Sequence, residues 1–264
     1  MNKTMEKNSM FKKLILTSAA VMALSVPSAH AAESAGVHEI VDVPFSFEGP
    51  LGTYDKASLQ RGLMVYRQVC AGCHSLKRVA YRNLEDLGYS PEQIKTIAGD
   101  VTVMDGPNDE GEMFERPGRP SDRFKSPFVN DKAAASANGG AIPPDLSLIT
   151  KARHGGADYV YSILTGYAEA PHGVVIAEGK HYNKAMDGNV IAMAPPLSDG
   201  AIAYEDGTPQ IVSQYAKDVA TFLTWAAEPE MEHRKQMGVK VVLFLSIFAV
   251  VMYAVKRQIW KKVH

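Results

Sequence analysis

The spacing of apolar residues along the chain predicts a series of helices and almost no strands. Leu59, Leu63, Tyr66 and Val69 recur at intervals of three or four residues, which places them on one face of a helix that Asp55 caps. Shorter helices that end at glycines are expected over 91–99, 131–137, 145–153 and 158–165. The first of these begins with a capping box, Ser90-Pro91-Glu92-Gln93. These patterns predict an all-α body.

The longest helical pattern in the body comes near its end. Its apolar face is expected to consist of Ile211, Tyr215, Val219, Phe222 and Ala226. We expect Thr208 to cap this helix and Pro209 to occupy its first turn. Glu228-Pro229 should end it.

Other stretches carry no such period. Residues 32–54 are predicted to form an irregular lead-in, because they show no helical spacing and contain Gly49, Pro50 and Gly52. Residues 100–128 hold three glycines and four prolines, which predicts a large irregular surface insertion. A short strand or hairpin around 173–179 stays open as an alternative to a loop.

Both ends of the chain carry membrane-targeting patterns. Residues 1–31 combine four lysines, an apolar run over 14–26 and the cleavage pattern Ala29-His30-Ala31, as a secretory signal peptide does. Residues 241–255 form an apolar run without a charge, and its extension to 237–257 gives a length suited to a single transmembrane helix. Because basic residues follow it at once, we expect 258–264 to be a cytoplasmic tail and 32–233 to be exported into the periplasm.

The net charge of the exported part indicates which kinds of partner it can bind. Residues 32–233 contain 28 acidic and 17 basic side chains, so this segment is strongly negative although the whole chain carries a formal charge of only -1. A negative surface argues against nucleic acid as a partner and favours a basic one. The 100–128 insertion carries a group of acidic residues that we regard as a candidate docking patch for a basic electron carrier: Asp100, Asp105, Asp109, Glu110, Glu112 and Glu115.

The only two cysteines of the chain lie in the pentapeptide Cys70-Ala71-Gly72-Cys73-His74. C-x-x-C-H is the attachment pattern of c-type haem: each sulfur forms a thioether with a porphyrin vinyl group, and the histidine becomes an axial iron ligand. A thioredoxin-like redox pair would need a preceding strand, whereas a helical pattern leads into this motif. A zinc site would need further ligands nearby, and the next histidine is His154.

The second axial ligand must come from elsewhere in the body. Outside the signal peptide, the anchor region and the helix before the motif, the methionines that remain are Met104, Met113, Met186 and Met193. We prefer Met193, because Pro195 and Pro196 favour an extended strap that could lay its thioether over the haem. Met186 is the second choice. A histidine is the third choice: His154, His172 or His181.

With these residues in view, the chain resembles cytochrome c1, the haem subunit of the cytochrome bc1 complex. The similarity lies in 70–74, 138–147, 151–156, 191–197 and 206–230. It implies a class I cytochrome c-like haem domain with one covalently bound haem c, His74 and Met193 as axial ligands, Arg153 near a propionate and Pro144 beside the haem. In soluble class I cytochromes c, a glycine in the position of Gly62 lets the C-terminal helix cross closely, so we expect the same here.

The resemblance also implies a role and its partners. A cytochrome c1 accepts electrons from the Rieske iron-sulfur subunit, lies beside cytochrome b in the inner membrane and passes electrons to a cytochrome c. The chain alone would be an electron carrier, whereas the whole complex is a quinol–cytochrome c reductase. Two alternatives remain: another membrane-anchored cytochrome that feeds a terminal oxidase, and a haem-free exported thiol oxidoreductase.

Overall fold

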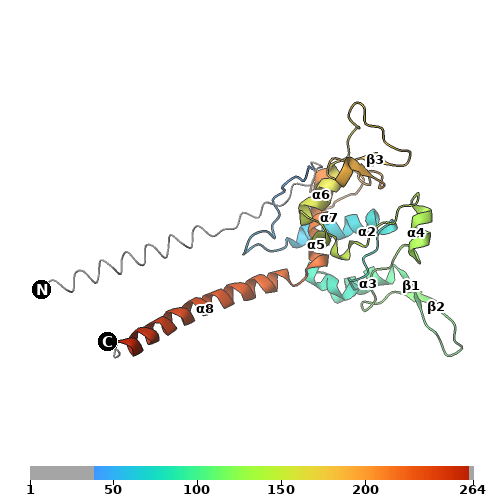
Figure 1. The fold of residues 1–264 in the computed structure, drawn as a ribbon. Coiled ribbons are helices and arrows are strands. Elements are labelled where there is room, and N and C mark those ends of the chain that lie inside the picture. Colours follow the sequence, from blue (N-terminus) through green and yellow to red (C-terminus); the bar gives the residue numbers. More distant parts are fainter. Residues whose placement is uncertain (1–38, 262–264) are drawn as a thin grey trace. The chain divides into compact units, whose positions relative to one another are not determined.

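The computed structural model describes residues 39–261, and the expected signal peptide lies outside them. This part of the chain is mostly helical, with two small two-stranded sheets (Figure 1). The α-helices are α2 (Lys56–Gln68), α3 (Pro91–Gly99), α4 (Asp131–Ala137), α5 (Ile149–Ala152), α6 (Gly156–Thr165), α7 (Val212–Ala227) and α8 (Met231–Trp260). The 3-10 turns are η1 (Cys70–Gly72), η2 (Tyr81–Leu87), η3 (Leu146–Leu148) and η4 (Asp187–Asn189). Antiparallel pairs join β1 (Thr102–Asp105) to β2 (Phe114–Pro117) and β3 (His181–Tyr182) to β4 (Val190–Ile191).

The core is built on the crossing of α2 and α7. Leu63 and Tyr66 of α2 are fully buried against α7, where Tyr215 and Phe222 are also fully buried. A Cβ atom on Gly62 would lie only 2.2 Å from the carbonyl oxygen of Asp218 and 2.6 Å from the Cβ of Phe222. The two helices therefore approach each other closely only because position 62 is glycine, as expected from the resemblance to class I cytochromes c.

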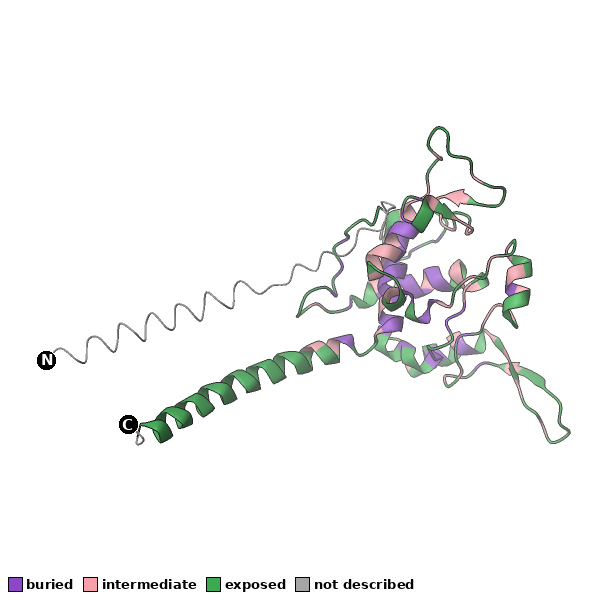
Figure 2. Cartoon of the chain, in the orientation of Figure 1, coloured by how far each residue is buried: buried purple, intermediate pink, exposed green. Residues whose placement is uncertain are grey.

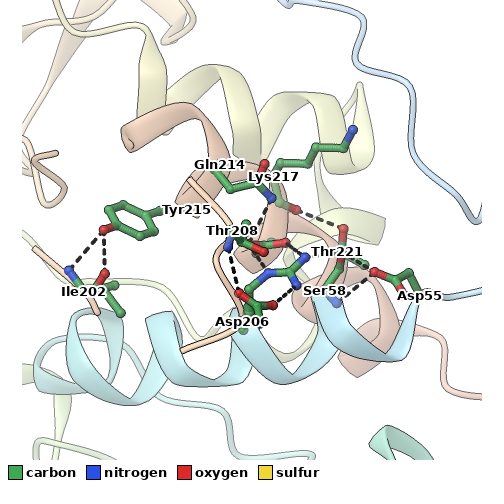
Figure 3. A network of polar contacts seen from close by, with 11 residues as sticks. Asp55, Ser58, Ile202, Asp206, Thr208, Gln214, Tyr215, Lys217 and Thr221 are labelled. Carbon is green, nitrogen blue, oxygen red and sulfur yellow. Dashed lines mark hydrogen bonds and ion pairs between the residues drawn. The ribbon is translucent and has the colours of Figure 1, made fainter. Parts of the chain in front are cut away.

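A buried ion pair spans the same crossing and was not foreseen from the sequence. Arg61 of α2 reaches Asp218 of α7 with two hydrogen bonds, Nε to Oδ2 at 2.9 Å and Nη2 to Oδ1 at 3.1 Å. Its third nitrogen, Nη1, lies 2.7 Å from Asp206 Oδ2. Figure 3 shows this network, in which Gln214 also donates to Asp218. Burial opposes the charge on Arg61, but the two carboxylates raise the pKa of Arg61 above its ordinary value.

The helix starts that depend on adjacent residues are confirmed. Asp55 accepts a hydrogen bond from the Ser58 backbone N–H at the N-terminus of α2. The Ser90 and Gln93 pair forms the expected reciprocal capping box on α3. The helices over 131–137 and 158–165 are also found, the latter beginning earlier, at Gly156.

The predicted start of the last body helix is wrong. Helix α7 begins at Val212, whose N–H donates at 2.8 Å to Asp199, in the loop that precedes the helix. Thr208 instead closes a turn, with its N–H bonded to Asp206 Oδ1 at 3.0 Å. Ile211 is consequently left outside the buried face, whereas the other four predicted residues are buried. The end of the helix before Glu228 is confirmed.

The 145–153 helix is also wrong as predicted, because the segment divides into η3 and the four-residue α5. The side chain of Asp145 starts η3 by accepting from the Ser147 N–H. The possible strand over 173–179 is not found; the strands of this region are β3 and β4, which flank a tight turn at Gly188.

The 100–128 insertion is more regular than expected, because it contains the β1–β2 hairpin. Arg116 on β2 pairs with Asp105 on β1 and holds Asp122 with two hydrogen bonds of 2.6 and 3.0 Å. This arginine lowers the pKa of Asp122 to about 2. Gly118 then fits tightly under α3, where an added Cβ would lie 2.4 Å from the Ala98 carbonyl oxygen. Ion pairs and close backbone packing therefore support the insertion.

Helix α8 differs from every other described helix in its exposure. All its side chains from 236 onward are exposed (Figure 2), although the helix has a mean hydropathy of 2.3 over its most apolar window. Thirty residues span about 45 Å as a helix, more than the roughly 30 Å of a bilayer's hydrocarbon core. Because the helix is neither buried nor N-terminal, its length and composition fit a single-pass membrane anchor.

Polar contacts join the start of α8 to the irregular segment before α2. The Tyr54 N–H donates to Glu232 at 2.7 Å, and the Tyr54 hydroxyl donates to the Glu228 carbonyl at 3.1 Å. Lys235 donates to the carbonyl oxygens of Phe47 and Gly52. The irregular segment before α2 thus fastens the first turns of α8.

Candidate functional site

One tight turn after the end of α2 presents the predicted haem-attachment residues. Cys70 begins η1, and its carbonyl oxygen accepts hydrogen bonds from the N–H groups of Cys73 at 3.1 Å and His74 at 2.8 Å. Cys70 is half-buried and Cys73 is exposed, and the two are not joined in a disulfide. The tight turn therefore holds both sulfurs and the imidazole on one short, bonded segment.

The His74 ring is oriented by a hydrogen bond from a distant segment. Its Nδ1 lies 2.8 Å from the carbonyl oxygen of Pro144. A carbonyl oxygen can only accept, so Nδ1 must carry the proton and Nε2 must carry the free lone pair. This arrangement prepares Nε2 to bind a metal, in the way that other metal-binding histidines are oriented by an acceptor on their second nitrogen.

Asp145 fastens these two segments to each other. Its Oδ2 accepts from the Ser75 hydroxyl at 2.7 Å and from the Lys77 N–H at 3.0 Å. The Leu146 N–H donates to the Ser75 carbonyl at 2.9 Å, beside these contacts. Burial alone would raise the pKa of Asp145, but its hydrogen bonds lower it, so the carboxylate stays ionised as an acceptor.

Burial shifts the pKa values of two groups in the motif. It raises the pKa of the Cys70 thiol to about 12, so this thiol stays protonated at neutral pH. Burial lowers the pKa of His74, and the Pro144 hydrogen bond only partly offsets this. The imidazole is therefore kept neutral, which is the form that binds iron.

The two residues placed near the haem by family resemblance, Pro144 and Arg153, line one pocket. It has a volume of about 510 Å³. The remaining lining residues are Lys77, Arg78, Arg123, Asp145, Leu148, Ile149 and Ala152. Arg153 is exposed, and its only described hydrogen bond goes to the adjacent Ala152 carbonyl. Its guanidinium is thus available to an anionic group such as a propionate.

The two candidate methionine ligands, Met186 and Met193, have different surroundings. The sulfur of Met186 already accepts a hydrogen bond from the Tyr159 hydroxyl at 3.9 Å. Met193 is half-buried, and its backbone carbonyl oxygen accepts from the Tyr167 hydroxyl at 3.0 Å. No hydrogen bond to its thioether is found among the described residues. Within residues 39–261 no described hydrogen bond joins either sulfur to His74, so the sixth ligand stays a prediction. His154 and His172 are exposed, and His181 lies in β3.

Several residues of this region carry no motif that sequence reasoning could use. Tyr66 donates to the His74 carbonyl at 3.2 Å and supports the motif from within α2. Asn183 is fully buried and donates to the Ile163 carbonyl at 2.8 Å. The partner of each side chain is a backbone carbonyl oxygen, which only the fold brings close. The four-residue spacing of Tyr66 and Cys70 does place these two residues in one row of a helix.

The set of donors present fits an attached haem. Two sulfurs on one turn attach such a cofactor, and an imidazole with its Nε2 free can bind its iron. Arg153 lines the pocket next to Pro144, whose carbonyl oxygen holds the His74 ring. A C-x-x-C-H motif of this kind in a mostly helical domain, followed by a helix long enough to cross a membrane, is characteristic of membrane-anchored cytochromes.

The family follows from similarity to known proteins. The Cytochrome C1 family model matches residues 45–263. The chain is 46% identical over 261 residues to "Cytochrome c1" of Rhodospirillum rubrum, with 93% of the chain and 96% of the relative covered. The chain therefore belongs to the cytochrome c1 family.

Two further relatives differ in length from the chain. It is 50% identical over 213 residues to "Cytochrome b-c1 complex catalytic subunit, mitochondrial" of Candida albicans, which covers 80% of the chain and 74% of the relative. It is also 51% identical over 242 residues to "Cytochrome b/c1" of Bradyrhizobium diazoefficiens, which covers 83% of the chain. The chain spans only about a third of that last protein, 35% of its length.

Proposed function

We propose that the chain carries single electrons through one covalently bound haem c, as the haem subunit of a cytochrome bc1 complex. The observation that carries this proposal is the hydrogen bond from His74 Nδ1 to the Pro144 carbonyl, directly after the two cysteines. It supports iron ligation by Nε2, which a thiol oxidoreductase would not require. Membership of the cytochrome c1 family supports the same role.

Each residue then has a definite part. Cys70 and Cys73 form the two thioethers, and His74 and Met193 fill the two axial positions. When bound, the haem supplies an iron that alternates between the ferric and ferrous states. Pro144 fixes the His74 tautomer, and Arg153 pairs with a propionate. Because both axial positions are filled by the protein, the site is suited to electron transfer and leaves no position for oxygen chemistry.

The membrane arrangement follows from the two ends of the chain. Residues 1–31 act as a signal peptide, 32–233 form the periplasmic haem domain and 237–257 anchor it in the inner membrane, with 258–264 as a cytoplasmic tail. Helix α8 supports a single crossing, and the basic residues after it support a cytoplasmic C-terminus. Cytochrome b and a Rieske protein would be its partners in the complex, and a basic cytochrome c would be its acceptor. The complex, rather than this chain alone, would be the quinol–cytochrome c reductase.

Extraction in mild detergent tests this function. We expect the chain to co-purify with a cytochrome b and a Rieske iron-sulfur protein, and to show a pyridine haemochrome spectrum of one haem c per chain. A chain without haem would contradict the whole proposal. A haem-bearing chain that co-purifies with a terminal oxidase, without cytochrome b, would contradict only the bc1 assignment.

The acidic tip of the β1–β2 hairpin gives a prediction about the acceptor. Asp109, Glu110 and Glu112 in the connecting loop and Glu115 on β2 are exposed, and none is in a described ion pair. The double variant Glu110→Gln/Glu112→Gln should reduce the rate of electron transfer to a basic cytochrome c at low salt by about tenfold, because steering is lost. Stopped-flow measurements over a range of salt should show the two rates converging at high salt.

A control with the same change in charge is available on another loop. Glu169 and Glu178 are exposed and lie away from the hairpin in sequence. Glu169→Gln/Glu178→Gln should change the low-salt rate much less. Equal effects of the two double variants would show that net charge matters and that the hairpin is not the docking surface.

A further inference from the structure

The segment that carries Met193 has very little backbone support of its own. The β3–β4 ladder holds it up to Ile191, and its next backbone hydrogen bonds begin at Ser198 and Gly200. Pro195 and Pro196 have no N–H group to donate. Within 192–197, the hydrogen bonds that the structure describes are those from the Tyr167 hydroxyl to the carbonyl oxygens of Met193, at 3.0 Å, and Ala194, at 3.5 Å.

Tyr167 is itself firmly placed. It follows the end of α6, where Gly166 has no room for a side chain: an added Cβ would lie 2.6 Å from the Ser162 carbonyl oxygen and 3.0 Å from Asn183 Oδ1. The Lys184 N–H donates to the Gly166 carbonyl at 2.9 Å, and Tyr167 pairs with Asn183 in an isolated bridge.

Asn183 connects this corner to the core. It is fully buried, its amide nitrogen donates to the Ile163 carbonyl of α6 at 2.8 Å, and its amide oxygen accepts from the Ala185 N–H at 3.0 Å. A rigid corner therefore presents one hydroxyl to an otherwise loosely held strap.

We propose that Tyr167 is a positioning residue that holds the 192–197 strap so that the Met193 thioether stays on the haem iron. The inference rests on the proposed function, because it takes Met193 as the axial ligand. A thioether is a weak ligand, so the strain or freedom of the segment that carries it decides how often it leaves the iron. A hydrogen bond to the carbonyl of the ligating residue itself restrains that segment at the point where restraint matters.

The test is Tyr167→Phe in the full chain with haem attached, because this change removes one oxygen and keeps the ring. We expect the ferric variant to bind added imidazole about fivefold more tightly than the unaltered chain, since the loss of one hydrogen bond favours dissociation of the methionine. The weak red-edge absorption band of methionine-ligated ferric haem should be reduced, and the reduction potential should fall. Haem content, measured as the pyridine haemochrome, should not change.

Tyr161→Phe is the matched control. Tyr161 lies on the same helix, α6, and no hydrogen bond of its hydroxyl is described in the structure. Tyr161→Phe should leave the imidazole affinity, the red-edge absorption band and the reduction potential unchanged. If Tyr167→Phe and Tyr161→Phe behave alike, the hydroxyl of Tyr167 does not position the ligand and the inference is wrong.

The unaltered chain and Met193→Leu separate this failure from failure of the proposed function. If the unaltered chain lacks the red-edge band, or keeps it after Met193→Leu, the ligand assignment is wrong and the inference about Tyr167 falls with it. If Met193→Leu abolishes the band but Tyr167→Phe leaves every property unchanged, the ligand assignment stands and only the role of Tyr167 is overturned.

Discussion

Met193→Leu is expected to leave the haem attached, to lower its reduction potential steeply and to open the sixth position of the iron. Leucine is close to methionine in volume but has no sulfur to donate, so the packing of the strap should be kept while the ligand is lost. A thioether favours ferrous iron, and axial ligands set haem potentials over a range of roughly 0.8 V. Redox titration and the binding of carbon monoxide to the ferrous form measure the two effects.

Met186→Leu is the matched comparison, because Met186 was the second choice of ligand and its sulfur already receives the Tyr159 hydroxyl. It should keep the native potential and should not bind carbon monoxide. The reverse result, with Met193→Leu unchanged and Met186→Leu opened to carbon monoxide, would transfer the ligand to Met186 and would contradict the argument from the strap.

Features set by adjacent residues could be predicted from the sequence. The Asp55 cap, the Ser90–Gln93 box and the glycine that ends α4 all act within a few residues, so the one-dimensional pattern contains their cause. The haem motif is of the same kind, because its two sulfurs and its imidazole occupy one turn. Features of this kind can be predicted from the sequence because all the residues that form them are neighbours in it.

Features set by distant partners could not be predicted. Helix α7 begins where Asp199 reaches Val212, so the earlier local signal at Thr208 and Pro209 misled the prediction. The β1–β2 hairpin depends on ion pairs of Arg116, and its strands are too short to show a clear alternation. Propensity was overridden by tertiary contacts in both cases.

The residues of the candidate site also fall into these two groups, those predicted from adjacent residues and those that depend on more distant ones. Cys70, Cys73 and His74 followed from spacing, whereas Pro144 and Arg153 came from resemblance to a family, because 70 or more residues separate them from the motif. Asp145 was expected only as part of a helix, yet its carboxylate joins the two halves of the site. Tyr167 carried no sequence signal, since its partner is a backbone carbonyl that any residue could supply.

The largest loss of stability is expected from Arg61→Met. Asp218 has none of its surface exposed, and Arg61 supplies two of the hydrogen bonds to its carboxylate. Removing the cation leaves a buried negative charge with only neutral partners, which costs about 3–5 kcal/mol of the free energy of unfolding. Denaturant titration of the detergent-solubilised full chain, followed by tryptophan fluorescence, should show the lower midpoint, because Trp225 is buried in the same core.

A second change should reverse most of this loss of stability. It shows whether the loss comes from the unpaired charge of Asp218 or from the lost packing of Arg61. The double variant Arg61→Met/Asp218→Leu removes both ions and leaves apolar groups of similar volume, and such replacements of buried ion pairs are often neutral or stabilising. We therefore expect its denaturation midpoint to return close to that of the unaltered chain. If the double variant were instead less stable than Arg61→Met, the network in Figure 3 would owe its effect to shape rather than to the pairing of Arg61 with Asp218. Under the expected result, Arg61 is needed only because Asp218 is charged, and the α2–α7 crossing itself is stabilised by apolar packing and by the close approach that Gly62 allows.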